Sequence, residues 1–199
     1  MSTKMNLKGP MRKSAYDFEN SVWPKVSQWV GSGKLVPVEN VTDHEMAKLL
    51  DQTSGIDAWY VENNTGIRGI ASRVQWQCNA KNPKNFPYET FTVRQQKYNG
   101  VDTEFRKLTN AIENDWLYPY WFVHAYMTEP RGKLMSVSCV KTKDLIKFIT
   151  NNPKRCPIMD NRMDAWFYAV KWDDIREKYH LDTYPEKTFF KKSQLDKFW

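Results

Sequence analysis

The sequence predicts a mixed α/β (α+β) fold, in which helices flank a central mixed β-sheet. Three observations favour this class: amphipathic helical spacing near the N-terminus, two β-rich segments forming a hairpin at 56–76, and strand-to-helix junctions at 140–145 and 170–175. Such mixing of elements favours one sheet with helices packed on it. With 199 residues, 41% of them hydrophobic, the chain is expected to form a single domain over residues 1–199.

Two helices are expected before the first strand. Ser14 can cap a helix over about 15–30, whose apolar residues recur at helical spacing as Phe18, Val22, Val26 and Trp29. Pro24 is expected to kink or divide this helix, and Gly31 to end it. The capping box at 42–45 predicts a second helix that closes near Asp51. Residues 1–13 contain four basic residues and no acid, which predicts a flexible basic segment.

The remaining elements follow from strand composition and turn residues. Strands are expected at 56–62 and 67–76, joined by a turn at 63–66, and a third strand at 88–98. Thr103 is expected to cap a helix that runs to about Asn114. The segment at 118–127 reads as a buried strand with 134–140 as its neighbour, and a final buried strand contains Trp166 and Phe167.

The charge of the chain favours polyanionic partners. Its formal charge is +7, and Lys and Arg gain affinity for nucleic acid by releasing counterions from phosphates. DNA is favoured over RNA as the partner. The other interpretation is that the positive charge only keeps the protein soluble. Three cysteines without paired spacing favour a reducing cytoplasm. No apolar run reaches the roughly 18 residues that span a bilayer, so no membrane partner is expected.

Several enzyme classes lose support because their motifs are missing. The sequence has no phosphate-binding Gly-x-x-x-x-Gly-Lys-Ser/Thr, no Gly-x-Gly-x-x-Gly and no Gly-x-Ser-x-Gly. The three histidines and three cysteines lack paired zinc-ligand spacing, and His124, alone on a strand, is expected to be structural.

The most informative stretch lies between residues 42 and 94. It contains a helix ending at Asp51, the tripeptide Gly55-Ile56-Asp57 at the start of a strand, a turn, and the run 69–76 in the next strand. This order resembles the PD-(D/E)XK nucleases, the restriction-endonuclease-like family, over about residues 14–98. The resemblance implies a restriction-endonuclease-like core. It also implies an acid at the start of one strand and an acid-x-Lys on the next, which bind magnesium and position a water for phosphodiester cleavage.

Residue by residue, the resemblance assigns an incomplete catalytic site. Asp57 matches the first acid and would be the metal ligand, whereas Ala71-Ser72-Arg73 stands where acid-x-Lys is expected. Arg73 can imitate the lysine and Gln75 offers a neutral oxygen on the same face, but Ala71 supplies no oxygen to magnesium. Magnesium binding is therefore expected to be weak, and the site is expected to hold phosphate better than it cuts it.

Further residues extend the predicted surface. Thr92 shares a strand face with Arg94, and Glu19 on the first helix is a further candidate acid that could approach the site. The expected nucleic-acid contacts are Arg68, Arg94, Lys191 and Lys192. The other interpretation of Asp57 is a turn acid, and of Arg73 an exposed strand charge or a partner of Asp57. Asp57, Arg73 and Gln75 are predicted to meet at one edge of the sheet.

Three functions are compatible with these residues. The leading hypothesis is a nucleic-acid-binding protein that resembles a magnesium-dependent endonuclease and is weakly active or inactive. The first alternative is a non-catalytic phage or mobile-element protein that binds and inhibits a host factor. The second is an RNA-binding module in which unpaired bases stack on aromatic side chains, drawn from Trp59, Trp76, Tyr88, Tyr98, Tyr118, Tyr120 and Trp121.

Overall fold

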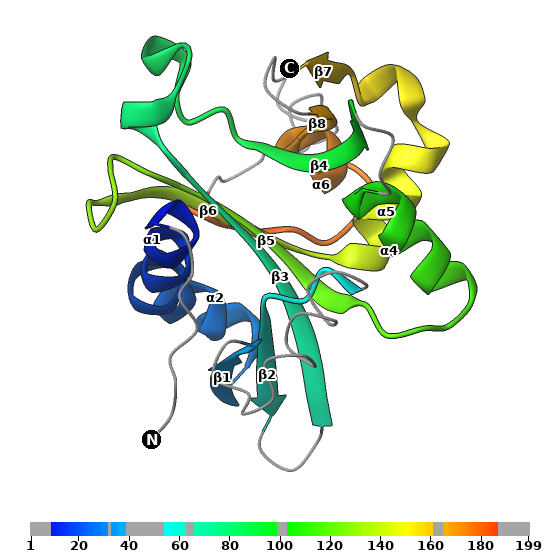
Figure 1. The fold of residues 1–199 in the computed structure, drawn as a ribbon, viewed down its shortest axis with the longest axis horizontal. Helices are drawn as coiled ribbons and strands as arrows, with labels where there is room; N and C mark the ends of the chain where they lie inside the picture. The colour runs from blue at the N-terminus through cyan, green and yellow to red at the C-terminus, as the bar shows by residue number, and fades with distance from the viewer. Residues whose placement is uncertain are drawn as a thin grey trace, which may run out of the picture.

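The computed structural model describes residues 9–31, 33–38, 54–62, 66–98, 103–160 and 165–186. These residues form two β-sheets with helices around them (Figure 1). The strand order is β1-β2-β3-β5-β6-β9 in the larger sheet and β4-β8-β7 in the smaller one. The predicted mixed α+β class is confirmed, whereas the division of the strands between two sheets was not predicted.

The larger sheet is built on the predicted hairpin. Strands β2 (Ala58–Glu62) and β3 (Gly66–Trp76) pair antiparallel, and β3 continues in parallel with β5 (Pro119–Met127). Strand β6 (Leu134–Lys141) lies beside β5, as expected, and the two strands pair antiparallel. The outer strands β1 (Gly33–Pro37) and β9 (Asp182–Tyr184) were not predicted.

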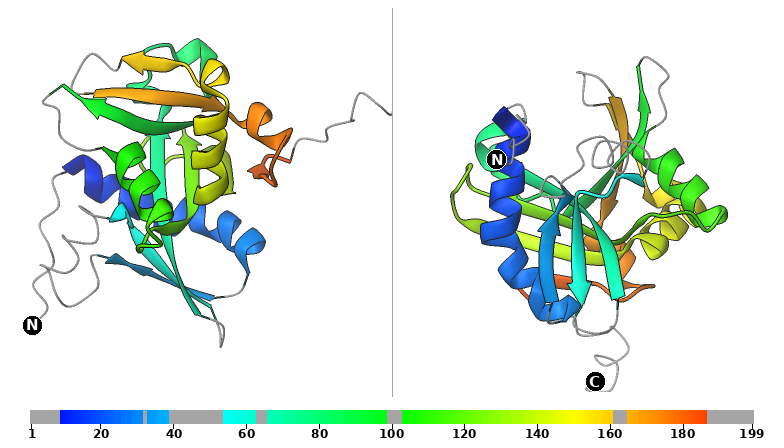
Figure 2. Two further views of the ribbon diagram at one scale, coloured as in Figure 1. Left: turned by 90° about the vertical axis from the view of Figure 1, so that its right-hand side faces the viewer. Right: turned by 60° about the horizontal axis from the view of Figure 1, so that its bottom comes forward.

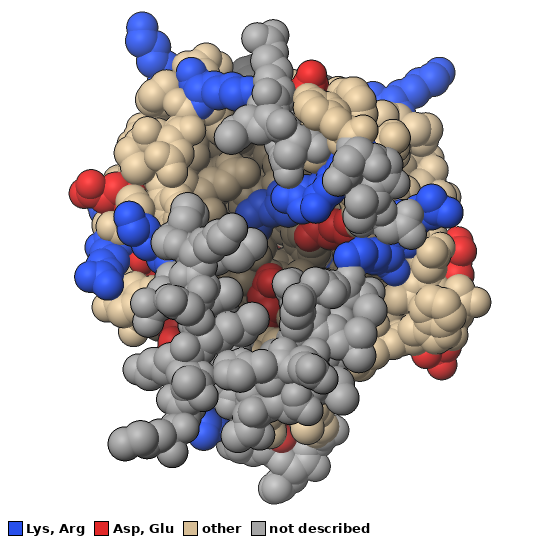
Figure 3. All heavy atoms as spheres, in the orientation of Figure 1, with Lys and Arg blue, Asp and Glu red and all other residues tan. Residues whose placement is uncertain are grey.

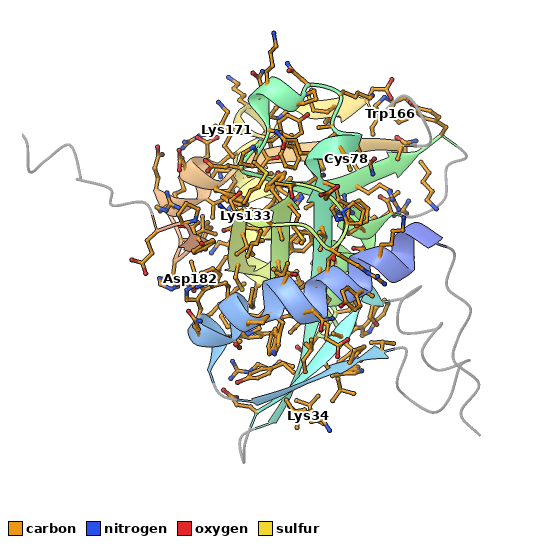
Figure 4. The ribbon with its side chains drawn as sticks, turned by 90° about the vertical axis from the view of Figure 1, so that its left-hand side faces the viewer. Lys34, Cys78, Lys133, Trp166, Lys171 and Asp182 are labelled. Carbon is orange, nitrogen blue, oxygen red and sulfur yellow. The ribbon has the colours of Figure 1, made fainter. Side chains whose placement is uncertain are left out.

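One face of the larger sheet is covered by the N-terminal helices. Helix α1 (Gly9–Asp17), the π-helical segment η1 (Phe18–Val22) and α2 (Trp23–Val30) cross this face, as Figure 4 shows. Their buried side chains pack against the strand residues on this face. The resulting core includes Val22, Val26, Ile70, Val74, Val123 and Cys139. Alternation along β3 therefore places Ile70, Val74 and Trp76 on the helix-covered face.

The start of the first helix differs from the prediction. Helix α1 begins at Gly9, so residues 9–13 are helical rather than a flexible segment, and Ser14 lies inside the helix instead of capping it. The helix is divided as expected, because Pro24 sits in the first turn of α2, where its missing N–H group needs no partner. Gly31 ends α2 with a φ of 109°, a value that favours glycine. Residues 1–8 and the predicted helix at 42–51 lie outside the described residues.

The opposite face of the larger sheet carries the second layer. It is covered by α4 (Glu104–Glu113), α5 (Thr142–Asn151) and α6 (Trp172–Arg176), together with the smaller sheet. The shared core contains Ala71, Phe91, Phe122, Val140, Leu145, Phe148 and Ile175. Thr103 precedes α4 as predicted, but its hydroxyl donates to the carbonyl of Gln95 at 2.6 Å instead of capping the helix.

The smaller sheet contains β4 (Thr90–Lys97), β8 (Ala165–Lys171) and β7 (Ile158–Asp160). It stands at a steep angle to the larger sheet (Figure 2). The strand predicted at 88–98 is thus present as β4, but it leaves the central sheet because β5 occupies the position beside β3. Within the described part of the chain, no helix is both long and apolar enough to cross a membrane.

Candidate functional site

Asp57 lies directly before β2, at the base of the hairpin. Its backbone N–H donates to the carbonyl of Ile70 at 2.9 Å, which continues the β2–β3 pairing by one residue. Its carboxylate accepts hydrogen bonds from the backbone N–H of Ser72 at 2.6 Å and from the Ser72 hydroxyl at 3.4 Å. The side chain thereby satisfies an amide of β3 that β2 is too short to reach. This contact explains Asp57 as a structural residue.

Arg73 connects three elements. From β3 its guanidinium donates to Thr92 Oγ1 on β4 at 3.0 Å and to Glu104 Oε2 on α4 at 3.1 Å. The side chains of Arg73 and Glu104 are 28% and 22% exposed, so the ion pair is partly shielded from solvent. Thr92, which was expected to extend the predicted surface, thus contacts Arg73, and Glu104 holds the guanidinium in place.

The other residues of the predicted trio lie along the same strand. Ala71 is 3% exposed and packs in the core beneath α4 and α5, while Gln75 is half-buried opposite Tyr126 of β5. Ala71, Arg73 and Gln75 share one face of β3 by alternation. The hydrogen bonds of Asp57 and Arg73 go to different partners, and the meeting of Asp57, Arg73 and Gln75 in one pocket stays a prediction.

A row of side chains fixes the free edge of β4 to the larger sheet. The backbone N–H groups of Thr90, Thr92 and Arg94 donate to Tyr126 Oη at 3.1 Å, His124 Nδ1 at 3.3 Å and Glu104 Oε2 at 3.0 Å. Alternate amides of an edge strand point the same way, so these three acceptors replace a neighbouring strand. We call the group Arg73, Glu104, His124 and Tyr126 the polar seam.

Burial sets the protonation of the polar seam. It lowers the pKa of His124 well below its usual 6.5, and the nearby Arg73 charge adds to this effect. Because His124 Nδ1 accepts from Thr92, the proton of the neutral ring sits on Nε2, which has no hydrogen-bond partner among the described residues. Burial also raises the pKa of Tyr126 to about 12. The prediction that His124 is structural agrees with these contacts.

The smaller sheet has one face in the core and one face away from it. Phe91, Val93, Tyr168 and Val170 point into or against the core, whereas the pairs Arg94–Phe167 and Phe167–Met159 lie on the other side. We call this second side the basic face and define it by Thr90, Thr92, Arg94, Lys97, Met159, Ala165, Phe167, Ala169 and Lys171. Part of it is covered, since Ala165 is 1% and Thr92 6% exposed. The three strands place three cations and no carboxylate on this side, and Glu104 of α4 lies at its edge, where it accepts a hydrogen bond from the Arg94 amide.

The cations of the basic face are available to a ligand. Arg94, Lys97 and Lys171 make no ion pair with any described residue. The one carboxylate in the three strands, Asp160, lies on the opposite face and accepts a hydrogen bond from Tyr98. Figure 3 shows basic side chains across the upper half of the molecule, where the smaller sheet lies, with acidic side chains beside them near the centre.

The other predicted contacts have different positions. Arg68 lies 3.5 Å from Glu62 and 4.6 Å from the centre of the Tyr120 ring, so it is already engaged by protein groups. Glu19 is exposed on η1, in the helical layer on the face of the larger sheet opposite Arg73. Lys191 and Lys192 lie outside the described residues.

The aromatic residues proposed for base stacking do not form one platform. Trp76 is buried beneath the N-terminal helices and donates to Asp17 Oδ2 at 2.8 Å. Tyr88 packs against Phe86 and Tyr126 in the other layer. These rings therefore lie on two sides of the larger sheet.

The described residues contain no group of three or more His, Cys, Asp or Glu side chains placed to hold one metal ion. Of the two acids suggested for the nuclease site, Glu19 lies on the other face of the larger sheet, and Asp57 already accepts two hydrogen bonds from Ser72. The residues at these positions therefore do not fit the magnesium site that the resemblance implies.

Among the residues of the basic face, Arg94 was expected from the sequence as a nucleic-acid contact, whereas Lys97, Phe167 and Lys171 were not. Phe167 was expected in a buried strand, yet it is half-buried on the basic face. The available signal was the period of two in 165–171, where Ala165, Phe167, Ala169 and Lys171 share one face and the apolar Tyr168 and Val170 share the other.

Comparisons with known proteins give no relative for this chain. No family model matches the sequence, and searches of curated proteins and of solved structures find no match.

Proposed function

We propose that this protein binds nucleic acid through the basic face, and that it cleaves the bound strand weakly or not at all. The observation that supports binding is the set Arg94, Lys97 and Lys171, three cations on one sheet face that has no carboxylate. DNA is the first polymer to test. A cation that has no protein partner can give its full charge to a phosphate, which releases the counterions condensed on the nucleic acid.

The proposed weak cleavage is argued from the positions that the nuclease resemblance assigns. Asp57 stands at the base of the β2–β3 hairpin, which is where the resemblance requires an acid. Ala71 supplies no metal ligand, and Arg73 is held by Glu104 and Thr92. Arginine also stays protonated, so it is a poor group for proton transfer. Incubation of supercoiled plasmid with magnesium should give slow nicking or none, and rapid nicking would contradict the proposal.

Restoring the missing acid is not a simple test of this site. Ala71 is 3% exposed and packs with Phe122 and Leu145, so Ala71→Glu would bury a carboxylate in the core. Burying an unpaired charge costs several kcal/mol, on the order of the whole stability of a small domain. Loss of folding would then mask any gain in metal binding.

A salt series tests nucleic-acid binding directly. Affinity for a fluorescent DNA oligonucleotide should fall steeply with salt, and Arg94→Gln/Lys97→Gln/Lys171→Gln should reduce the logarithmic salt slope by about 2–3. The matched control is Lys34→Gln/Lys143→Gln/Lys147→Gln, which removes the same number of positive charges. These three lysines are exposed on β1 and α5, away from the basic face. In Figure 4, Lys34 lies far from Lys171.

Two results would count against the proposal. One is absence of binding at low salt, which would favour the alternative of a protein that binds a host factor. The other is an equal loss of slope in the control variant, which would mean that total charge, and not the basic face, determines binding.

A further inference from the structure

Phe167 occupies the middle of the basic face. It lies on β8, the central strand of the smaller sheet, with Arg94 of β4 opposite it on one side and Met159 of β7 on the other. Its neighbours on the same face of β8 are Ala165 and Ala169. Both are small, but Ala165 is 1% exposed, so the strand is covered at that end, whereas Phe167 and Ala169 are half-buried.

The ring has no aromatic partner in the described part of the protein, unlike its neighbours in sequence. Trp166 packs on Tyr98 with ring centres 4.6 Å apart, and Tyr168 packs on Phe105 at 4.9 Å, both on the core side of the sheet. No described ring contacts Phe167. Its aromatic surface is therefore not used by the fold in the way that Trp166 and Tyr168 are.

Cations lie on both sides of the Phe167 ring along β8. Lys171 ends β8, and Lys97 lies opposite Ala165 near its start, so the two lysines are separated by about 20 Å along a strand that rises about 3.3 Å per residue. Figure 4 labels Trp166 and Lys171 at opposite ends of β8. Arg94 lies between them beside Phe167. The face therefore offers a ring in the centre and positive charge along the whole strand.

We propose that the basic face binds single-stranded nucleic acid, with an unpaired base stacked on Phe167 and neighbouring phosphates contacted by Arg94, Lys97 and Lys171. This inference rests on the proposed function and names its substrate class. Aromatic side chains beside a basic path are the pattern that recognises unpaired bases, because every base has a face that can stack. In a duplex that face is covered by the adjacent base pairs, so a duplex could use the cations but not the ring.

The test compares a thymine oligonucleotide with a duplex of the same length, using the full chain and one salt concentration. The wild-type protein should bind the single strand more tightly. Phe167→Leu keeps an apolar side chain but removes the ring, and should weaken single-strand binding about 5- to 150-fold, because one stacked base contributes roughly 1–3 kcal/mol. Phe167→Trp keeps a ring and should retain most of the affinity. Duplex affinity should change less than about twofold in both variants, since it depends on phosphate contacts.

A fluorescent base analogue in the oligonucleotide gives a second reading. Its emission should be quenched on binding to wild-type protein and to Phe167→Trp, and less so with Phe167→Leu. Equal loss of affinity for both polymers in Phe167→Leu, or tighter binding of the duplex by the wild type, would overturn the inference while leaving nucleic-acid binding intact. If the protein binds neither the single strand nor the duplex, the proposed function itself is wrong. Single-stranded RNA of the same length should bind with similar affinity, because stacking alone accepts both sugar types.

Discussion

The polar seam and the basic face are adjacent, yet they use charge in opposite ways. In the seam, Arg73 is held by Glu104 and Thr92, and every polar group named there except His124 Nε2 has a partner. On the basic face, Arg94 has no carboxylate partner among the described residues. Arg73 of the predicted motif thus helps to hold the two sheets together, while the cations without an ion pair lie on the smaller sheet.

Removing the central acid of the seam should have the largest effect on stability. Glu104→Ala leaves the Arg73 guanidinium and the Arg94 amide without their acceptor, and should lower the free energy of unfolding by about 2–3 kcal/mol. Denaturant unfolding measures the change. Glu113→Ala is the matched control, since Glu113 is exposed on the same helix and should change stability by less than about 0.5 kcal/mol. Equal stability of the two variants would show that the seam does not join the sheets.

Acid should weaken the seam through His124. The folded protein keeps this residue neutral because its pKa is lowered well below 6.5, whereas the unfolded chain takes up a proton near pH 6.5. The unfolded state then binds more protons at low pH, so stability should fall below pH 6.5 by at most about 1.4 kcal/mol per pH unit from this residue. At higher pH the contribution is fully present.

Urea unfolding at a series of pH values measures this dependence. His124→Asn keeps an acceptor near the Nδ1 position and removes the titrating group. Its free energy of unfolding should therefore depend less on pH below 6.5 than that of the wild type. His180→Asn is the control, because His180 is 81% exposed. If His124→Asn keeps the slope of the wild type, other groups account for the acid sensitivity.

The elements that the sequence predicted well are those whose signal is local. The hairpin β2–β3, the buried strand β5 and its neighbour β6 follow from composition and turn residues, and all are present. The departure of β4 from the larger sheet depends on β5 pairing with β3, which is a contact between distant segments. Short strands such as β7, with three residues, have too few positions for alternation to be visible.

The site was predictable in a similar way. Alternation placed Arg73 and Gln75 on one face because period two is local, whereas the contact of Arg73 with Thr92 joins strands of two sheets. The role of Glu104 was not visible, since its partners come from two other elements of the chain. Phe167 was expected to be buried because aromatic strand residues usually pack in cores, and only the second sheet gave its strand an outward face.

Arg94 and Arg73 allow the most specific comparison, in which the expected changes in stability and in salt slope are the smallest. Arg94→Gln should leave the free energy of unfolding within about 0.5 kcal/mol of wild type, because the side chain has no partner to lose and the Arg94 backbone amide still donates to Glu104. The same substitution should reduce the logarithmic salt slope for nucleic acid by about 1. Arg73→Gln should do the reverse, lowering stability by about 1–2 kcal/mol as Glu104 loses its ion pair, with little change in salt slope. Denaturant unfolding and a salt series on both variants measure the four values. If Arg73→Gln lowers the slope as much as Arg94→Gln while both remain folded, then phosphate reaches the seam as well, and the division between a structural and a ligand-binding arginine is wrong.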